Sequence, residues 1–239
     1  LYDHTGRFKL IAKREGKRFH LRSASEELLG PRMGSRKLLH TTDLIINLLR
    51  EGGLKRFKNR QSIQCKVEPI DGFIAQLSEL VSKLQQDTLF RRDREIFEWA
   101  LEYPWVAEQG CDPINYHFSY RAMRFENILH HVIHPEENSQ GILWLIIHNN
   151  VLSVPYLFAG DKSLYTCMAE TIIKTMIDSG ISHTTIRNPQ LIAGLMTNKR
   201  VFLSVRKMPQ LIFAHNVLVG LLPEKPVIHD GDGDVMFTG

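Results

Sequence analysis

Cysteine is scarce in this sequence, and no two cysteines have a recognisable spacing. Only three occur among 239 residues, at Cys65, Cys111 and Cys167, and none belongs to a Cys-x-x-Cys pair. An odd number of widely separated cysteines argues against a disulfide framework and against a zinc site. We therefore expect reduced thiols with structural roles and no bound metal.

Long apolar segments are also missing. The longest uninterrupted run covers residues 142–147, far short of the roughly 20 residues that cross a bilayer. No charged-then-apolar segment of the kind that directs secretion opens the chain. We expect a cytoplasmic protein without a membrane partner, and, because the first residue is Leu1 rather than Met, a piece of chain upstream of it.

The sequence motifs of several enzyme classes do not occur. There is no Gly-x-Ser-x-Gly elbow, no Walker loop, no His-Glu-x-x-His pair and no dinucleotide fingerprint. These motifs position a nucleophilic serine, a nucleotide phosphate, a catalytic zinc ion and a dinucleotide, respectively. Their absence argues against the corresponding hydrolases, nucleotide triphosphatases, metalloproteases and dehydrogenases.

Two clusters contain residue types that bind metals. His130, His131 and His134 are close in sequence, but no carboxylate or cysteine completes a known ligand spacing. We interpret them as ordinary sheet or surface histidines, with a metal ligand or a catalytic base as the alternative. The alternating Asp and Gly residues of 230–234 look like part of a calcium loop, yet too few residues follow to complete one. A solvated acidic turn is the simpler interpretation.

Basic residues gather in the first 60 positions, although the whole chain has a net charge of only +4. This distribution fits either a solvated face or the binding of an anionic partner. We place a domain boundary where the basic part ends, between a segment over 1–65 and an α/β domain over 66–239. The clustered basic residues are Arg7, Lys9, Lys13, Arg14, Lys17, Arg18, Arg22, Arg50, Lys55, Arg56, Lys58 and Arg60.

The first hundred residues contain patterns of a hairpin and three helices. Alternating apolar residues around Glu15-Gly16 predict a hairpin over 7–22. Helical spacing follows until Gly52-Gly53, and again over 71–86 and from the N-cap Asp93 to Tyr103, which precedes a proline. The apolar residues of the first helix are Leu38, Leu44, Ile45, Leu48 and Leu49.

Patterns of strands dominate the next sixty residues. We expect strands over 116–122 and 128–133, and two apolar strands over 141–148 and 151–158. Asn149-Asn150 suits the positive φ angles of the tight turn between the last two. The alternating aromatic residues of 116–120 favour core packing over base stacking, although Arg121 and Arg124 are near.

The following residues form a strand–helix–strand unit. A helix over 163–179 with Gly180 as its cap separates strand 151–158 from a strand over 184–187. Two strands joined in this way run parallel. Asn188-Pro189 begins another helix, and strands over 201–205 and 211–215 follow. The sequence thus predicts an α/β fold with a mixed sheet.

This order of elements resembles that of the GNAT (GCN5-related N-acetyltransferase) superfamily. The local string Arg92-Asp93-Arg94-Glu95-Ile96-Phe97-Glu98-Trp99 ahead of the sheet and the Asp-Gly-rich tail add to the resemblance, which covers about residues 88–239. The resemblance leaves 1–65 unassigned, and part of a second, related module is one alternative for it. Trp99 and Trp105 either cover the short helix or wall an acceptor groove.

The resemblance implies an acyl-CoA between strands 151–158 and 184–187, with its pyrophosphate on the amides that begin the following helix. The cofactor-binding residues that it implies are Phe158, Ala159, Gly160, Lys162, Ser163, Leu164, Tyr165 and Asn188. The usual glycine-rich phosphate loop is replaced by a segment containing Asp161. Thr197 stands where the tyrosine proton donor is expected, so no catalytic residue is named.

The function that follows is acyl transfer from acetyl-CoA or another acyl-CoA to an amine. The acceptor that we expect is a small molecule such as an amino sugar or an amino acid, and nucleic acid is not expected as a partner. A homo-oligomer is compatible with the sequence. The alternative is a catalytically silent GNAT-like module that binds or assembles through its basic N-terminal face.

Overall fold

The computed structural model describes residues 6–25, 36–60, 64–71, 75–85, 91–102, 106–108, 120–220, 222 and 227–232. Structural statements below refer to these residues. Several predicted features lie outside them: Cys111, Trp105, the aromatic residues of 116–119 and the last aspartate of the tail.

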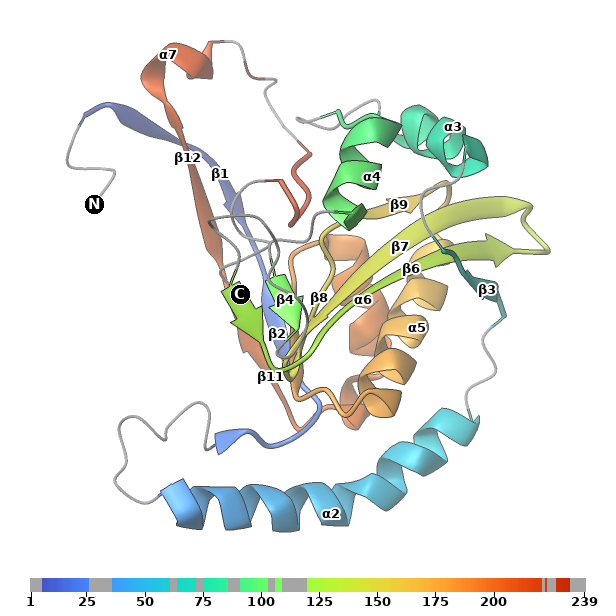
Figure 1. The fold of residues 1–239 in the computed structure, drawn as a ribbon, viewed down its shortest axis with the longest axis vertical. Helices are drawn as coiled ribbons and strands as arrows, with labels where there is room; N and C mark the ends of the chain where they lie inside the picture. The colour runs from blue at the N-terminus through green and yellow to red at the C-terminus, as the bar shows by residue number, and fades with distance from the viewer. Residues whose placement is uncertain are drawn as a thin grey trace.

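A mixed sheet forms the centre of the protein (Figure 1). Its strands lie in the order β11-β2-β10-β8-β7-β6-β3, and β9 pairs with β7 beside that path. The bounds are β2 Lys17–His20, β3 Lys66–Pro69, β6 Phe125–His134, β7 Ser139–His148, β8 Val151–Ser153, β9 Leu157–Ala159, β10 His183–Ile186 and β11 Ser204–Lys207. Two smaller ladders join β1 Phe8–Arg14 to β12 Gln210–His215 and β4 Val106–Glu108 to β5 Tyr120–Ala122.

Helices cover both faces of the sheet. Helices α5 Leu164–Asp178 and α6 Pro189–Thr197 pack on one face, and α3 Ala75–Leu84 and α4 Arg94–Glu102 pack on the other. The long helix α2 Arg36–Arg60 lies along one end of the molecule, and the short helix α7 Asn216–Val219 follows β12 (Figure 1).

Strand β7 shows why the centre of the sequence is apolar without interruption. Successive side chains of a strand point to opposite faces. Leu143, Leu145 and Ile147 enter the core under α5 and α6. The alternate residues Trp144 and Ile146 enter the second core, with Phe97 of α4. Both faces of β7 are therefore buried, as is typical of an inner strand.

The strand–helix–strand unit is confirmed. Strands β8 and β10 pair in parallel on either side of α5 in the chain. Gly180 ends the helix with φ of +69°, which a residue with a side chain adopts at a cost. Asn188 caps α6 because its side-chain oxygen accepts from the Leu191 amide at 2.9 Å. The turn at Asn149, with φ of 52°, also matches the prediction.

The predicted hairpin over 7–22 is wrong. Within residues 6–25, β1 pairs with β12, and β2 pairs with β10 and β11. The chain bends at Gly16, where a Cβ atom would lie 2.3 Å from the Met208 carbonyl oxygen. The two predicted strands therefore belong to different sheets, and each pairs with strands from the second half of the chain. The division of the chain at residue 65 stays a prediction.

Helix α2 differs from the prediction in two ways. It continues through Gly52-Gly53 to Arg60, because Leu54 is buried and Phe57 packs against the main core. Its predicted apolar stripe faces outward instead, with Leu48 and Leu49 exposed by 77% and 79%. Polar contacts hold the inner face, among them the Arg22–Glu51 ion pair at 2.7 Å.

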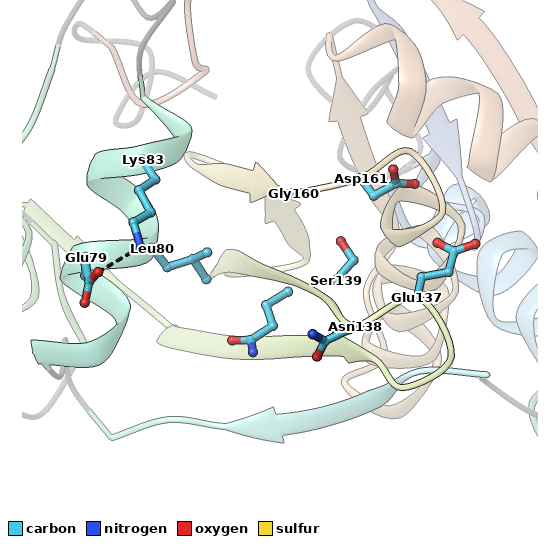
Figure 2. Close-up of a pocket in the computed structure, with 9 residues that line it drawn as sticks. Glu79, Leu80, Lys83, Glu137, Asn138, Ser139, Gly160 and Asp161 are labelled. Atoms are coloured by element: carbon cyan, nitrogen blue, oxygen red, sulfur yellow. Dashed lines mark hydrogen bonds and ion pairs between the residues drawn. The ribbon is translucent and has the colours of Figure 1, made fainter.

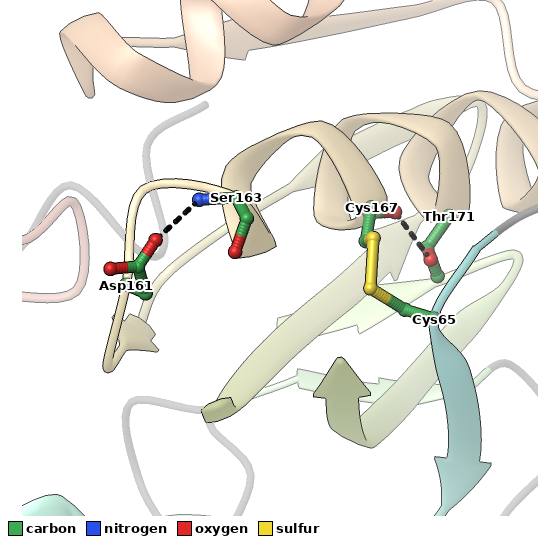
Figure 3. Close-up of a disulfide and its surroundings, with 5 residues drawn as sticks. All are labelled: Cys65, Asp161, Ser163, Cys167 and Thr171. Atoms are coloured by element: carbon green, nitrogen blue, oxygen red, sulfur yellow. Dashed lines mark hydrogen bonds between the residues drawn. A yellow bond between two sulfur atoms is a disulfide. The ribbon is translucent and has the colours of Figure 1, made fainter. Parts of the chain in front are cut away.

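The expectation of reduced thiols is wrong for two of the three cysteines. Cys65, just before β3, and Cys167, in the first turns of α5, form a disulfide with a Cα–Cα distance of 6.0 Å (Figure 3). Both are buried. Their sequence separation of 102 residues gives no local sign of the pairing, because only the packing of β3 against α5 brings them together.

Candidate functional site

Strands β8 and β10 separate after a short parallel ladder. They pair only at His183–Val151 and Thr184–Leu152. The chain then leaves the sheet over 154–156, and it continues as β9, which pairs with β7 and not with β10. A gap therefore opens between β9 and the end of β10. The predicted strand 151–158 is in fact these two strands with a bulge between them.

The register of β9 directs part of its backbone into this gap. The Trp144 amide donates to the Tyr156 carbonyl at 3.0 Å, and the Gly160 amide donates to the Gln140 carbonyl at 3.1 Å. Backbone groups along a strand alternate between its two edges. Leu157 and Ala159 lie between those bonded residues, so their N–H and C=O groups point away from β7, toward β10.

A cavity of about 770 Å³ occupies the gap. Its volume lies within the range of small-molecule sites, roughly 300–1,000 Å³. We call it the cleft. Its walls come from the bulge between β8 and β9, the end of β10, the start of α6, the bend after β1 and the segment 227–230.

Two of the eight predicted cofactor-binding residues line the cleft. Tyr165 of α5 and Asn188 are both in its wall. Burial raises the pKa of the Tyr165 phenol, and the nearby Asn188 side chain opposes that rise. Phe158 and Leu164 are instead buried in the two cores.

The start of α5 already holds an anion of its own. The Asp161 carboxylate accepts from the Ser163 amide at 3.0 Å, as Figure 3 shows. This bond lowers the pKa of the Asp161 carboxyl. The Ser163 hydroxyl is buried and has no hydrogen-bond partner. A pyrophosphate at this helix start would have to displace the Asp161 carboxylate from the Ser163 amide or bind farther out than that carboxylate.

Gly160 and Asp161 line a different hollow (Figure 2). It lies between α3 and the β6–β7 turn, with a volume of about 820 Å³, and it is wide open to solvent. Across it, Lys83 and Glu79 of α3 form an ion pair at 2.8 Å. The Gly160 amide is thus bonded to β7, and its exposed side lines this hollow. Gly160 does not line the cleft.

The segment 227–232, which we call the strap, was not predicted as part of the site. The Gly231 amide donates to the Pro155 carbonyl at 2.8 Å, and the Tyr156 hydroxyl donates to the Gly231 carbonyl at 2.7 Å. Asp232 interacts with Arg92 at 3.4 Å. Burial, and then the charge of Asp232, raises the pKa of the Tyr156 phenol. The alternating Asp-Gly pattern was visible in the sequence, but nothing local showed where it docks.

Other predicted candidates lie away from the cleft. Thr197 donates to the Gly194 carbonyl at 2.6 Å and faces a separate hollow beside α2. His130 is half-buried on β6, and burial lowers its pKa. In the described parts of the chain, no group of three or more His, Cys, Asp or Glu residues is placed to hold a metal ion. Nor does any helix described there have the length and apolar character needed to cross a membrane.

No protein-family model matches the sequence, and no curated protein matches it. Solved structures that match include a GCN5-related N-acetyltransferase from Anabaena variabilis ATCC 29413, with 8% identity and a TM-score of 0.44 over 92% of this chain. Another is a GCN5-related N-acetyltransferase from Kribbella flavida, with 15% identity and a TM-score of 0.39 over 89% of this chain. The chain spans less than half of either protein, 44% and 39% of their lengths.

The topology agrees with the family resemblance of the sequence. Antiparallel strands β6, β7 and β8 come first, then α5, the parallel strand β10, α6 and β11. The two neighbouring strands part around the cleft, where the resemblance implies that they should. The chain has an α/β fold with a mixed sheet.

Proposed function

We propose that the cleft binds the pantetheine arm of an acyl-CoA, and that the protein transfers the acyl group to an amine. The observation that carries this proposal is the parted pair of strands with gap-facing backbone groups at Leu157 and Ala159. An extended arm with amide groups of its own can pair with such an edge as an added strand does. Acetyl-CoA is the simplest co-substrate of this class.

Acyl transfer needs a donor for the charge that develops on the thioester oxygen. A fixed N–H group aimed at that oxygen is worth about 10²–10³ in rate. The Leu157 amide is the candidate, since it lies in the wall of the cleft and points away from β7. Positioning the amine beside the thioester supplies the rest.

The two ends of the co-substrate meet different surroundings. The cleft is lined by apolar residues such as Val154, Ile186 and Leu191, which suits the arm. At the start of α5, the Ser163 amide already donates a hydrogen bond to the Asp161 carboxylate. We therefore expect weaker binding of the pyrophosphate than a vacant helix start would give, and an affinity that comes mainly from the arm.

Calorimetry with acetyl-CoA tests the proposal. We expect binding by the wild type and a loss of about tenfold or more in Gln190→Trp, whose indole would enter the cleft from the first turn of α6. Lys199→Trp is the matched control, because Lys199 faces the separate hollow beside α2. If titration with millimolar acetyl-CoA gives no heat of binding, the proposal is wrong and the catalytically silent module is favoured.

The cytoplasmic location is part of this proposal, because acyl-CoA is an intracellular co-substrate. Thiols are kept reduced in that compartment. In such a compartment the reduced form of the Cys65–Cys167 pair is favoured.

A further inference from the structure

Half of the sheet carries a row of polar and basic side chains on the face opposite α5 and α6. The register sets Thr185 of β10 beside Arg18 of β2, and Arg18 beside Arg206 of β11. Directly paired residues project from the same face. Their chain neighbours, Phe19 and Ile186, enter the core under α5 and α6. The row with Arg18 therefore lies on the other face.

Arg187 extends this row toward the cleft. It is two residues beyond Thr185, so it projects from the same face, and it lines the cleft. Its stem lies over Gly16, where a Cβ atom would be 3.0 Å from the Arg187 Cγ atom. We call Arg18, Arg187 and Arg206 the arginine row.

The arginine row carries three positive charges, and the carboxylates near it do not neutralise all of them. Among the described residues, Asp230 is the one carboxylate in contact with it, 3.6 Å from Arg187, and Asp230 also pairs with Arg14 at 2.7 Å. Burial, followed by the charges of Arg187 and Arg206, lowers the pKa of the Arg18 guanidinium. Like charges placed directly opposite each other destabilise a sheet, so the row is retained at a cost in stability.

The donors of the row are oriented but incompletely used. The Arg18 Nε atom donates to the Thr185 hydroxyl at 2.9 Å, which fixes the plane of the guanidinium and leaves its two terminal nitrogens for another acceptor. The Arg187 Nε atom is buried without a partner, and so is the Nε2 atom of His20, which is 5% exposed. Arg206 is exposed.

We propose that the arginine row binds an oxyanion, a carboxylate or a phosphate, carried by the acceptor molecule. Guanidinium groups bind both kinds of anion through paired N–H donors. Because Arg187 also lines the cleft, an acceptor held by its anionic group would place its other end near the gap-facing Leu157 amide. The role of the anion in an acceptor rests on the proposed function, whereas the binding of the anion does not.

The site is distinct from the place expected for the phosphates of the co-substrate. Those phosphates belong at the start of α5, and α5 packs on the opposite face from the arginine row. The sheet separates the two positions. Neither Arg18 nor Arg206 lines the cleft, so substitutions at these two positions should leave acetyl-CoA binding unchanged.

Titration of the purified full chain with inorganic phosphate, and separately with succinate, tests the assignment. We expect saturable binding by the wild type and a loss of affinity of about tenfold or more in the double variant Arg18→Gln/Arg206→Gln. Arg56→Gln, an exposed arginine of α2, removes a charge elsewhere and should bind like the wild type. The tighter of the two anions identifies which class the acceptor carries.

Two results would overturn the assignment. One is equal phosphate and succinate affinity in the wild type and the double variant, and the other is an acetyl-CoA affinity that falls together with phosphate affinity in that variant. A cooperative thermal transition at or above the wild-type temperature shows that the double variant is folded. If anion binding depends on the row while the wild type does not bind acetyl-CoA, the row stands and the transferase proposal fails.

Discussion

Reduction of the Cys65–Cys167 bond should lower the free energy of unfolding by several kcal/mol. The perturbation is clean because the bond closes a long segment, with a sequence separation of 102 residues. In the chain-entropy model, a loop of that length restricts the unfolded chain by about 4.7 kcal/mol at 25 °C. The figure is an upper value, since unfolded chains retain some compactness.

Urea denaturation of the wild type with and without a phosphine reductant measures the effect. With a slope near 3 kcal/mol per molar urea, the full figure corresponds to a shift in the midpoint of about 1.6 M. The matched control is Cys65→Ala/Cys167→Ala, which should unfold at the same urea concentration in both buffers. Peptide mapping of the oxidised protein should find the two cysteines joined.

Equal midpoints for the wild type in the two buffers would refute the reasoning. So would a shift of the same size in the double variant, because the reductant would then be acting elsewhere. Both sulfurs are buried, so the comparison has to be made on samples reduced in the unfolded state and refolded.

Three further predictions concern single residues. Asn188→Ala should cost about 1 kcal/mol, because the cap on the Leu191 amide is lost, whereas Asn188→Asp should keep it; urea denaturation compares the two. Burial, helped by Arg18 and His20, lowers the pKa of His183 to about 4. As the pH falls, His183 is therefore protonated in the unfolded chain before it is protonated in the folded one. The free energy of unfolding should decrease between about pH 6.5 and 4, by up to about 1.4 kcal/mol per pH unit. Calorimetric scans should find a weaker pH dependence in His183→Asn. Arg206→Gln should stabilise the protein by about 0.2–1 kcal/mol because it relieves repulsion with Arg18, and an unchanged or lower melting temperature would contradict this.

The elements whose patterns are local could be predicted from the sequence. Three features could be recognised from a few neighbouring residues: the uninterrupted apolar run of β7, the glycine that ends α5 and the asparagine that begins α6. Asp93 likewise caps α4, since its side chain accepts from the Ile96 amide at 3.0 Å. The parallel pairing of β8 and β10 followed from the helix between them.

What could not be predicted depends on partners far away in the chain. A strand pattern such as that of residues 17–20 shows which face is apolar but not which strand lies beside it. The strap has no local sign of its docking on Tyr156, 75 residues away. The outward stripe of α2 followed helical periodicity, yet the face that is buried was decided by Leu54, Phe57 and polar contacts.

The same holds for the candidate site. Tyr165 and Asn188 were predicted from the family resemblance, and they line the cleft. Gly160 was expected to let the backbone approach a phosphate, but its amide is bonded to Gln140 of β7 and it does not line the cleft. The contributions of the bend after β1 and of the strap come from opposite ends of the chain, so no sequence window contains them together.

The position of β2 between β10 and β11 has a consequence for how the protein is made. Phe19 meets its neighbours Thr184 and Val205 only after most of the chain has been synthesised. Such distant pairing slows folding and leaves an early strand unsatisfied while the rest emerges from the ribosome. Until it inserts, both β10 and β11 present bare edges to other nascent chains, so the yield of native protein in a cell should depend on chaperones that shield this strand.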